Sequence, residues 1–257
     1  MISGVLLDLA GVVYDGDAAI PGAVEALALL RGAGLPLRFV SNTTRSAKGT
    51  VLDRLRRLGL VVIEDELFTP AQAARAWLLE HGCSPHLLIH PDLEPDFHGL
   101  ASGTRRAVVV GDAGEGFDYR SLNAAFRELN DGADLLALAN NRTFKDTDGK
   151  LSLDVGPFVA ALEFACQRKA VILGKPSSDF FQAALAGMNC LPEEAVMVGD
   201  DAEGDVAGAL SAGLGAALQV RTGKYRAGDE GRFEPPPTAV VDDLANAVNW
   251  ILARAVH

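Results

Sequence analysis

The sequence is poor in cysteine and in aromatic residues, and it has no long apolar run. Its three cysteines, Cys83, Cys166 and Cys190, are widely spaced without a C-x-x-C pair, which argues against a disulfide framework and favours a reducing compartment. Aromatic residues make up 6% of the chain, so we expect an aliphatic core. No apolar run approaches the roughly 20 residues of a membrane span, and the N-terminus lacks the basic lead of a signal peptide. We therefore expect a cytoplasmic protein.

Positive charge is also in deficit. The chain has 23 Lys and Arg against 34 Asp and Glu, a formal net charge of -11. Nucleic acids and anionic membranes both require a basic face, so we expect neither as a partner, and an anionic substrate would be held by a few local cations. With 257 residues and 49% hydrophobic content, the chain can bury one sizeable core and carry a second, smaller module.

The first apolar stretch ends in a carboxylate. The residues from Gly4 to Leu7 have the pattern of a buried strand, Asp8 follows directly, and Gly11 then turns the chain. An acid in such a place needs a partner, a hydrogen bond or a metal ion, because burying an unpaired carboxylate costs several kcal/mol. Asp8 is therefore a candidate nucleophile or metal ligand. The alternative is an aspartate that only caps the turn into Gly11.

Two later strand candidates also end in polar side chains. Ser41 and Asn42 follow residues 35–40 and precede a helix, where hydroxyl and backbone N–H groups can converge on a phosphate. The alternative is an ordinary segment that caps the helix. Lys175 follows an apolar strand at 170–173 and could meet an anion there as a point charge.

A fourth apolar strand, at 195–199, leads into an acidic loop. Asp200, Asp201 and Asp205 fall within six residues of one another. Carboxylates this close repel each other unless a cation lies among them, and hard oxygen ligands of this kind suit Mg²⁺. A surface acidic turn is the alternative, which the preceding apolar strand makes the weaker one.

The alternation of strands and helices predicts an α/β fold. The four polar strand ends would meet at the carboxyl edge of one doubly wound, Rossmann-like parallel sheet, where open α/β folds bind ligands. Between residues 84 and 168 further short strands and helices alternate. We therefore expect a core made of 1–83 plus 169–257, an α/β module inserted at 84–168, and a closing helix over 241–256.

The order of these motifs resembles that of the haloacid dehalogenase-like superfamily of phosphotransferases, which use an aspartate nucleophile. Asp8, Ser41, Lys175 and the run Gly199-Asp200-Asp201-(x)3-Asp205 stand where its four motifs stand, and the resemblance spans essentially the whole chain. The insert resembles the larger cap of the subgroup that also holds nucleotide and pyridoxal phosphate phosphatases. The resemblance implies a hydrolase whose cap closes over the site, and a homodimer formed through the cap.

The resemblance also implies roles for the acidic residues. Asp8 would attack the phosphorus in line and form an aspartyl-phosphate that water then hydrolyses. Mg²⁺ would be bound by Asp8, the backbone carbonyl of Ala10 and Asp200. Asp201 and Asp205 would orient metal-bound water or Lys175.

The phosphoryl group would be held by Ser41, the backbone N–H of Asn42 and Lys175. One position departs from the pattern, because phosphatases of the superfamily usually carry a general acid two residues after the nucleophile and this chain has Ala10. Losing a positioned acid typically costs about 10²–10⁴-fold in rate. We therefore expect phosphoamides (phosphohistidine, phospholysine) or inorganic pyrophosphate as substrates, since their leaving groups need that acid less.

Two other functions stay open at this point. Ala10 could mark a weakly active or inactive phosphoryl-binding regulatory protein, or the chain could be a phosphomonoesterase for a small metabolite. A P–C bond hydrolase, a relative with alanine at this position, is disfavoured because it needs a lysine from a cap between motifs one and two. The segment 12–39 contains none.

Substrate choice should depend on the cap. Asn141, Arg142, Phe144 and Lys145 follow a strand candidate at 135–138 and offer an amide, cations and a ring together. We interpret this stretch as a specificity loop of a cap that closes over the site. The alternative is a solvated hairpin edge.

Overall fold

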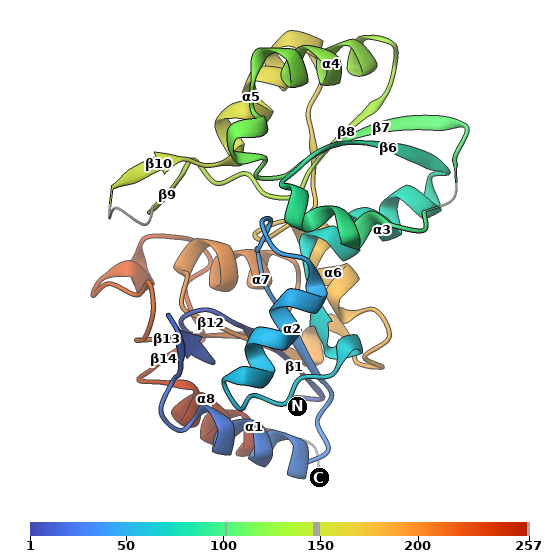
Figure 1. Cartoon of the computed structure of the whole chain (residues 1–257). Coiled ribbons are helices and arrows are strands. Elements are labelled where there is room, and N and C mark those ends of the chain that lie inside the picture. Colours follow the sequence, from blue (N-terminus) through green and yellow to red (C-terminus); the bar gives the residue numbers. More distant parts are fainter. Residues whose placement is uncertain (101, 146–149, 256–257) are drawn as a thin grey trace. The chain divides into compact units, whose positions relative to one another are not determined.

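The computed structural model describes residues 1–100, 102–145 and 150–255, apart from the side chain of Lys145, and the chain folds as two compact units (Figure 1). The first unit is built from three segments, Met1–Ser41, Val51–Phe68 and Lys175–His257. The second is built from Asn42–Thr50 and Thr69–Gly174. The expected division into a catalytic core and a cap stays a prediction about their roles.

A six-stranded parallel sheet forms the centre of the first unit, with the strand order β14-β13-β12-β1-β4-β5. β1 is an inner strand because its side chains from Val5 to Leu7 are apolar on both faces and all of its residues are buried. The α/β class with a doubly wound parallel sheet is thus confirmed. The strands are β1 (Gly4–Asp8), β4 (Leu37–Val40), β5 (Leu67–Phe68), β12 (Ala195–Gly199), β13 (Ala216–Val220) and β14 (Ala239–Val241).

Helices cover the sheet of the first unit. Leu27 and Leu30 of α1 and Val248 of α8 share one core with Val5 of β1, and α1 and α8 lie side by side (Figure 1). On other strands, α6 contacts β4 and α7 contacts β13. The remaining elements of this unit are α1 (Ala23–Gly32), α2 (Lys48–Arg57) from Val51 onwards, α6 (Ser178–Leu185), the π-helical turn η5 (Ala202–Ala207), α7 (Gly208–Ser211), α8 (Leu244–Leu252) and the hairpin strands β2 (Tyr14–Asp15) and β3 (Ala18–Ala19).

The closing helix differs from the predicted span of 241–256. Val241 is the last residue of β14, where it pairs with Val220. The helix begins only after Asp243, whose side chain accepts a hydrogen bond from the backbone N–H of Asn246 at 2.9 Å, and it ends at Leu252. The apolar residues before Asp243 thus form a strand at the sheet edge, which the spacing of apolar residues alone does not predict.

The second unit has a four-stranded parallel sheet with the order β11-β8-β7-β6. Apolar side chains of α4 and α5 pack with strand residues such as Val108 and Leu135 in one core, and β9 and β10 form an antiparallel hairpin. The elements are α3 (Pro70–Glu80), β6 (Cys83–Leu88), β7 (Arg105–Val110), α4 (Tyr119–Asn130), β8 (Asp134–Ala137), β9 (Thr143–Lys145), β10 (Leu151–Leu153), α5 (Val155–Cys166) and β11 (Val171–Ile172).

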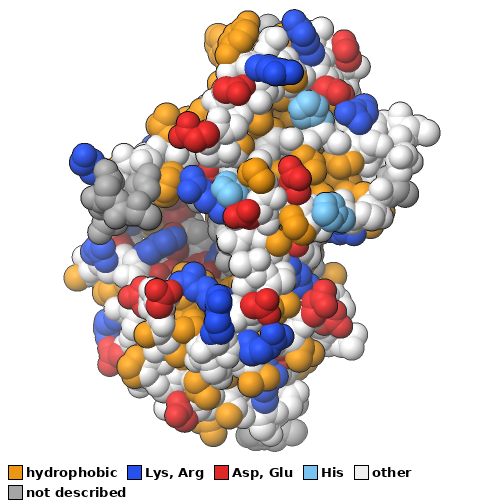
Figure 2. Space-filling model, viewed as in Figure 1, with side chains coloured by type: hydrophobic (Ala, Val, Ile, Leu, Met, Phe, Trp, Pro, Cys, Tyr) orange, Lys and Arg blue, Asp and Glu red, His pale blue; other side chains and the backbone are white. Residues whose placement is uncertain are grey.

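Short 3-10 turns connect several of these elements: η1 (Glu64–Glu66), η2 (Pro91–Phe97), η3 (Gly114–Gly116), η4 (Pro192–Glu194) and η6 (Asp229–Gly231). Within the described ranges, none of the helices combines the length and the apolar character needed to cross a bilayer. Figure 2 shows acidic and basic side chains interspersed over the viewed face. The expectation that nucleic acid is not a partner stays a prediction.

Candidate active site

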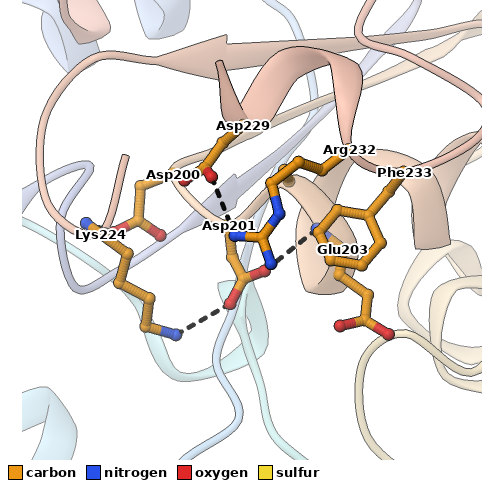
Figure 3. A pocket seen from close by; sticks show the side chains of 8 residues that line it. Asp200, Asp201, Glu203, Lys224, Asp229, Arg232 and Phe233 are labelled. Carbon is orange, nitrogen blue, oxygen red and sulfur yellow. Dashed lines mark hydrogen bonds and ion pairs between the residues drawn. The ribbon is translucent and has the colours of Figure 1, made fainter. Parts of the chain in front are cut away.

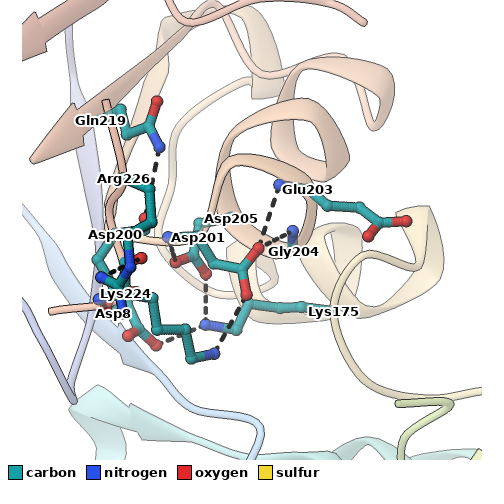
Figure 4. Close-up of polar contacts among 10 residues, drawn as sticks. All are labelled: Asp8, Lys175, Asp200, Asp201, Glu203, Gly204, Asp205, Gln219, Lys224 and Arg226. Carbon is teal, nitrogen blue, oxygen red and sulfur yellow. Dashed lines mark hydrogen bonds and ion pairs between the residues drawn. The ribbon is translucent and has the colours of Figure 1, made fainter. Parts of the chain in front are cut away.

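Asp8 and Lys175 meet at the carboxyl edge of the first unit's sheet. β1 places Asp8 there with 7% of its surface exposed, and Lys175 is 5% exposed. The ammonium Nζ of Lys175 lies 2.5 Å from Asp8 Oδ1 and 2.6 Å from Asp205 Oδ1 (Figure 4). Burial alone would lower the pKa of Lys175, but the charges of Asp205 and Asp8 and their hydrogen bonds outweigh it and raise that pKa. The lysine is therefore a fixed cation between two carboxylates.

Asp200 follows β12 and is 2% exposed. Its Oδ2 accepts a hydrogen bond from the backbone N–H of Lys224 at 2.7 Å, whereas its Oδ1 is buried and has no hydrogen-bond partner among the residues that the structure describes. Burial, followed by the nearby charge of Asp8, raises the pKa of Asp200 to about 6. A buried acceptor of this kind needs an explanation, and a bound cation is a common one.

Asp201 and Asp205 hold other groups in place. Asp205 is 1% exposed, and besides Lys175 it accepts the backbone N–H of Asp201, at its Oδ2, over 3.1 Å. Asp201 Oδ1 accepts the backbone N–H groups of Glu203 and Gly204 at 3.1 and 2.9 Å and so caps the turn η5 (Figure 4). Burial raises the pKa of Asp205 and outweighs the opposing charge of Lys175. Both of its oxygens are thus already engaged by the protein.

The donor set at this edge fits a hard divalent cation. Asp8, Asp200 and Asp205 offer carboxylate oxygens that all lie within 4.8 Å of one another, and Mg²⁺ and Ca²⁺ both prefer such oxygens. Because Asp205 is engaged by Lys175 and Asp201, Asp8 and Asp200 are the better placed ligands. The acidic cluster could therefore hold a metal ion. Ala10 lies exposed in the turn after β1, and its carbonyl as a ligand stays a prediction.

Ser41 reaches the same edge through the sheet register. Asp8 pairs with Val40 in the parallel ladder of β1 and β4, so Ser41 is the first residue beyond β4, and its backbone N–H donates to Phe68 O at 3.2 Å. Asn42 belongs to the second unit, where its Oδ1 would lie 2.9 Å from a Cβ built on Gly174. Their phosphate-binding roles stay predictions.

The predicted specificity loop is tied to its surroundings through its backbone. The carbonyls of Asn141 and Arg142 accept the backbone N–H groups of Gly156 and Asp154 at 2.9 and 3.2 Å, and both side chains are exposed. Phe144 is half-buried. The side chain of Lys145 lies outside the described residues.

Arg45 and Asp112 form a pair that sequence reasoning did not single out. Arg45 Nε lies 2.5 Å from Asp112 Oδ2 and its Nη2 3.3 Å from Oδ1, and its guanidinium lies 5.1 Å from the centre of the Phe144 ring. Asp112 is buried. The sequence signal that could have identified it is an acid two residues after the apolar strand that ends at Val110, by the reasoning applied to Asp8.

Lys224 is a second residue that sequence reasoning gave no role. Its Nζ lies 3.1 Å from Asp201 Oδ2, and it borders an open pocket of about 200 Å³ (Figure 3). The sequence gives only a weak signal for Lys224, because its contact with Asp200 uses a backbone N–H, which every residue except proline has. The pocket is lined by Asp200, Asp201, Ala202, Glu203, Lys224, Asp229, Arg232 and Phe233.

Comparison with known proteins places the chain in a family. Residues 5–114 match the model of the haloacid dehalogenase-like hydrolases, and 172–247 match a second model of the same kind, HAD-hydrolase-like. The chain is 48% identical over 251 residues to human haloacid dehalogenase-like hydrolase domain-containing protein 2, covering 98% of this chain and 96% of that one. It is 44% identical over 259 residues to phospholysine phosphohistidine inorganic pyrophosphate phosphatase of Xenopus laevis, covering 98% and 95%.

A solved structure agrees with these matches. The glycerol phosphate phosphatase of Mycobacterium tuberculosis, in complex with magnesium, superposes with a TM-score of 0.82 at 28% identity and covers 95% of this chain and 76% of that one. The predicted resemblance and the prediction of a hydrolase are confirmed. With its motif carboxylates and lysine gathered at one sheet edge, the chain belongs to the haloacid dehalogenase-like hydrolase family.

Proposed function

We propose that the chain is a Mg²⁺-dependent phosphohydrolase that works through an aspartyl-phosphate on Asp8. The observation that carries the proposal is the geometry at the end of β1. There Asp8 is held 2.5 Å from Lys175 Nζ beside Asp200, whose buried Oδ1 has no hydrogen-bond partner in the described part of the chain. A nucleophile, a fixed cation and an unsatisfied ligand for a second cation are the groups that phosphoryl transfer requires.

In the proposed reaction an Asp8 carboxylate oxygen attacks the phosphorus, and the bond from phosphorus to the leaving group breaks. Water then attacks the phosphorus of the aspartyl-phosphate, which releases inorganic phosphate and restores Asp8. Lys175 keeps Asp8 oriented, and together with Ser41 and the Asn42 N–H it would hold the phosphoryl oxygens. Positioning and electrostatic stabilisation then provide most of the rate enhancement.

Asp8, Asp200 and the carbonyl of Ala10 would hold Mg²⁺. When bound, the ion neutralises charge between the nucleophile and the phosphoryl oxygens. Asp201 and Asp205 act through other groups, since Asp205 anchors Lys175 at 2.6 Å and Asp201 caps the turn that carries Asp205. The magnesium named for the Mycobacterium tuberculosis phosphatase supports this choice of ion.

For substrate we propose phosphoamides, namely phosphohistidine and phospholysine, or inorganic pyrophosphate. Ala10 provides no general acid, so a leaving group that can take its proton from solvent, or is already a stabilised anion, is favoured. The name of the Xenopus laevis relative includes these three substrates. We further propose that residues 84–168 form a cap over the core made of 1–83 plus 169–257, and that the protein is a cytoplasmic homodimer formed through this cap.

The test is phosphate release from pyrophosphate, phosphohistidine, phospholysine and a panel of phosphomonoesters, with and without Mg²⁺. We expect Mg²⁺-dependent release from the first three and its loss in Asp8→Asn, which keeps the shape of the side chain but not its nucleophilicity. Asp179→Asn, a change on α6 outside the proposed machinery, is the control and should retain activity. Absence of turnover with every substrate, while metal still binds, would instead indicate a phosphoryl-binding regulatory protein.

A phosphomonoesterase is the second candidate. The Mycobacterium tuberculosis relative is named a glycerol phosphate phosphatase, so some members with this fold are named for monoesters. The same panel separates the two functions, because a monoesterase would turn over alcohol phosphates at least as fast as pyrophosphate.

A further inference from the structure

The segment Thr222–Lys224 follows β13 and has no part in the proposed reaction, yet it contacts both loops that carry the site. The backbone N–H of Lys224 donates to Asp200 Oδ2 at 2.7 Å. The hydroxyl of Thr222 donates to the carbonyl oxygen of Gly11, in the turn that follows Asp8. The segment therefore joins the loop after β1 to the loop after β12, as the position of Lys224 beside Asp200 in Figure 4 illustrates.

Two glycines allow this close approach. Gly11 and Gly223 have φ angles of 83° and 61°, a region that side chains with a Cβ rarely adopt. A Cβ on either residue would overlap Asp200 Oδ2, and one on Gly223 would lie 2.6 Å from Gly11 Cα. The carboxylate of Asp200 thus lies in a slot between two bare stretches of backbone.

The slot fixes one oxygen of Asp200 and leaves the other for a ligand. Rotation of an aspartate carboxylate about its Cβ–Cγ bond has a broad energy minimum, so the strand alone does not set the direction of the two oxygens. Here Oδ2 is held by the Lys224 N–H, while Oδ1 is buried and meets no hydrogen-bond partner within residues 1–100, 102–145 and 150–255. The segment therefore decides which oxygen is available, before any ion binds.

We propose that Thr222–Lys224 is a positioning segment that presents Asp200 Oδ1 to the cation and thereby sets the affinity for Mg²⁺. The inference rests on the proposed function, because it needs a cation held by Asp8 and Asp200. Groups that orient a metal ligand typically change metal affinity by about 10–100-fold when they are altered. Lys224 adds a second tie through its Nζ, which lies 3.1 Å from Asp201 Oδ2.

The test is calorimetric titration with Mg²⁺ alone, without substrate, of Gly223→Ala. The added Cβ would displace Asp200 Oδ2, and we expect the dissociation constant to rise by about 10–100-fold. Gly228→Ala is the matched control, because this glycine lies in the same connection with φ 95° but has no atom within 4 Å of an added Cβ among the described residues. It shares the backbone strain without the contact, and its Mg²⁺ affinity should equal that of the unaltered protein.

Thr222→Val provides an independent test if Gly223→Ala does not fold. Loss of one hydrogen bond should weaken Mg²⁺ binding roughly 5-fold, and Thr222→Ser, which keeps the hydroxyl, should restore it. An unchanged Mg²⁺ affinity in folded Gly223→Ala would overturn the inference, and Thr222→Val takes its place if Gly223→Ala does not fold. The proposed function would still stand in that case, provided that the unaltered protein shows Mg²⁺-dependent phosphate release. Failure of the unaltered protein to bind Mg²⁺ would overturn both.

Discussion

Lys175 contacts two buried carboxylates at once, and we expect the stability of the protein to depend on it. In Lys175→Met the carboxylates of Asp8 and Asp205 would lose a cation that lies 2.5 and 2.6 Å away. Breaking a buried pair by removing one partner typically costs about 3–5 kcal/mol. We expect a loss of that size in the free energy of unfolding, measured by urea denaturation at pH 7 in the presence of a chelator.

The control for this variant is Lys169→Met. Lys169 pairs with Glu163 at 2.9 Å but is 89% exposed, so its loss should change the free energy of unfolding by about 0–1 kcal/mol. At pH 4 the loss in Lys175→Met should shrink, because Asp205, whose pKa is raised by burial, can then take up a proton. Equal stability of Lys175→Met and the unaltered protein at pH 7 would contradict a charged, buried network.

Ala10 is the position at which substrate preference should respond to one substitution. The residue is exposed in the turn after β1, so an aspartate can be introduced there without crowding the core. Ala10→Asp should raise kcat/KM for alcohol phosphates by about 10²-fold or more, since a positioned general acid typically contributes 10²–10⁴-fold, and should change pyrophosphate hydrolysis little. Ala10→Asn, which cannot donate a proton in this way, is the control. Equal gains in both variants would contradict the leaving-group argument.

At the scale of elements, the parts of the fold that rest on apolar runs could be predicted from the sequence. β1 and β12 are fully buried, and such strands show as continuous apolar stretches that end at Asp8 and Asp200. β5 and β14 did not stand out, because two or three residues are too few to show a period and their pairing depends on distant strands.

The candidate site divides in the same way. The positions of the motif carboxylates and Lys175 at the ends of strands were predictable, because a charged residue beside a buried strand is costly unless it is paired or binds a ligand. The contacts of Lys224 and Arg45 were not, since one uses a backbone N–H and the other joins residues 67 positions apart. Such contacts arise from loop conformation and long-range packing, which local patterns do not encode.

We predict that the loop between β8 and β9 affects substrate binding through Phe144 and Arg45. The guanidinium lies 5.1 Å from the ring centre, and a cation–π contact of this kind contributes about 0.5–1 kcal/mol at an exposed site. Phe144→Ala should therefore raise KM by about 2- to 5-fold, with kcat and Mg²⁺ affinity unchanged. Phe164→Ala, which removes an 88% exposed ring from α5, is the control in steady-state kinetics. An unchanged KM in both variants would assign this loop to the solvated edge of a hairpin.

At the scale of the whole molecule, the acidic cluster links stability to pH and to metal. The pKa of Asp200 is raised to about 6, whereas an unfolded aspartate titrates near 3.9. The folded state therefore holds the proton more tightly, so the contribution of Asp200 to stability falls as pH rises from about 4 to about 6 and stays low above that. A shift of about 2 pKa units corresponds to roughly 3 kcal/mol.

Asp200→Asn should therefore be more stable than the unaltered metal-free protein by about 2–3 kcal/mol at pH 7 and by almost nothing at pH 4. The measurement is urea denaturation across pH with a chelator present. Addition of Mg²⁺ at pH 7 should raise the melting temperature of the unaltered protein by mass action and leave Asp200→Asn unaffected. If the stability difference between Asp200→Asn and the unaltered protein does not vary with pH, ionisation of Asp200 does not cause that difference.

The inner position of β1 also has a consequence for synthesis on the ribosome. β1 pairs on one side with β4, which follows soon, but on the other Gly4 pairs with Ala195 and Leu7 with Val198. At elongation rates of about 5–20 residues per second, β12 emerges roughly 10–40 s after β1. During that interval the nascent chain exposes an unpaired apolar strand edge. We therefore expect stalled chains that end before residue 195 to be recruited by chaperones, and the site to form only after β12 has been synthesised.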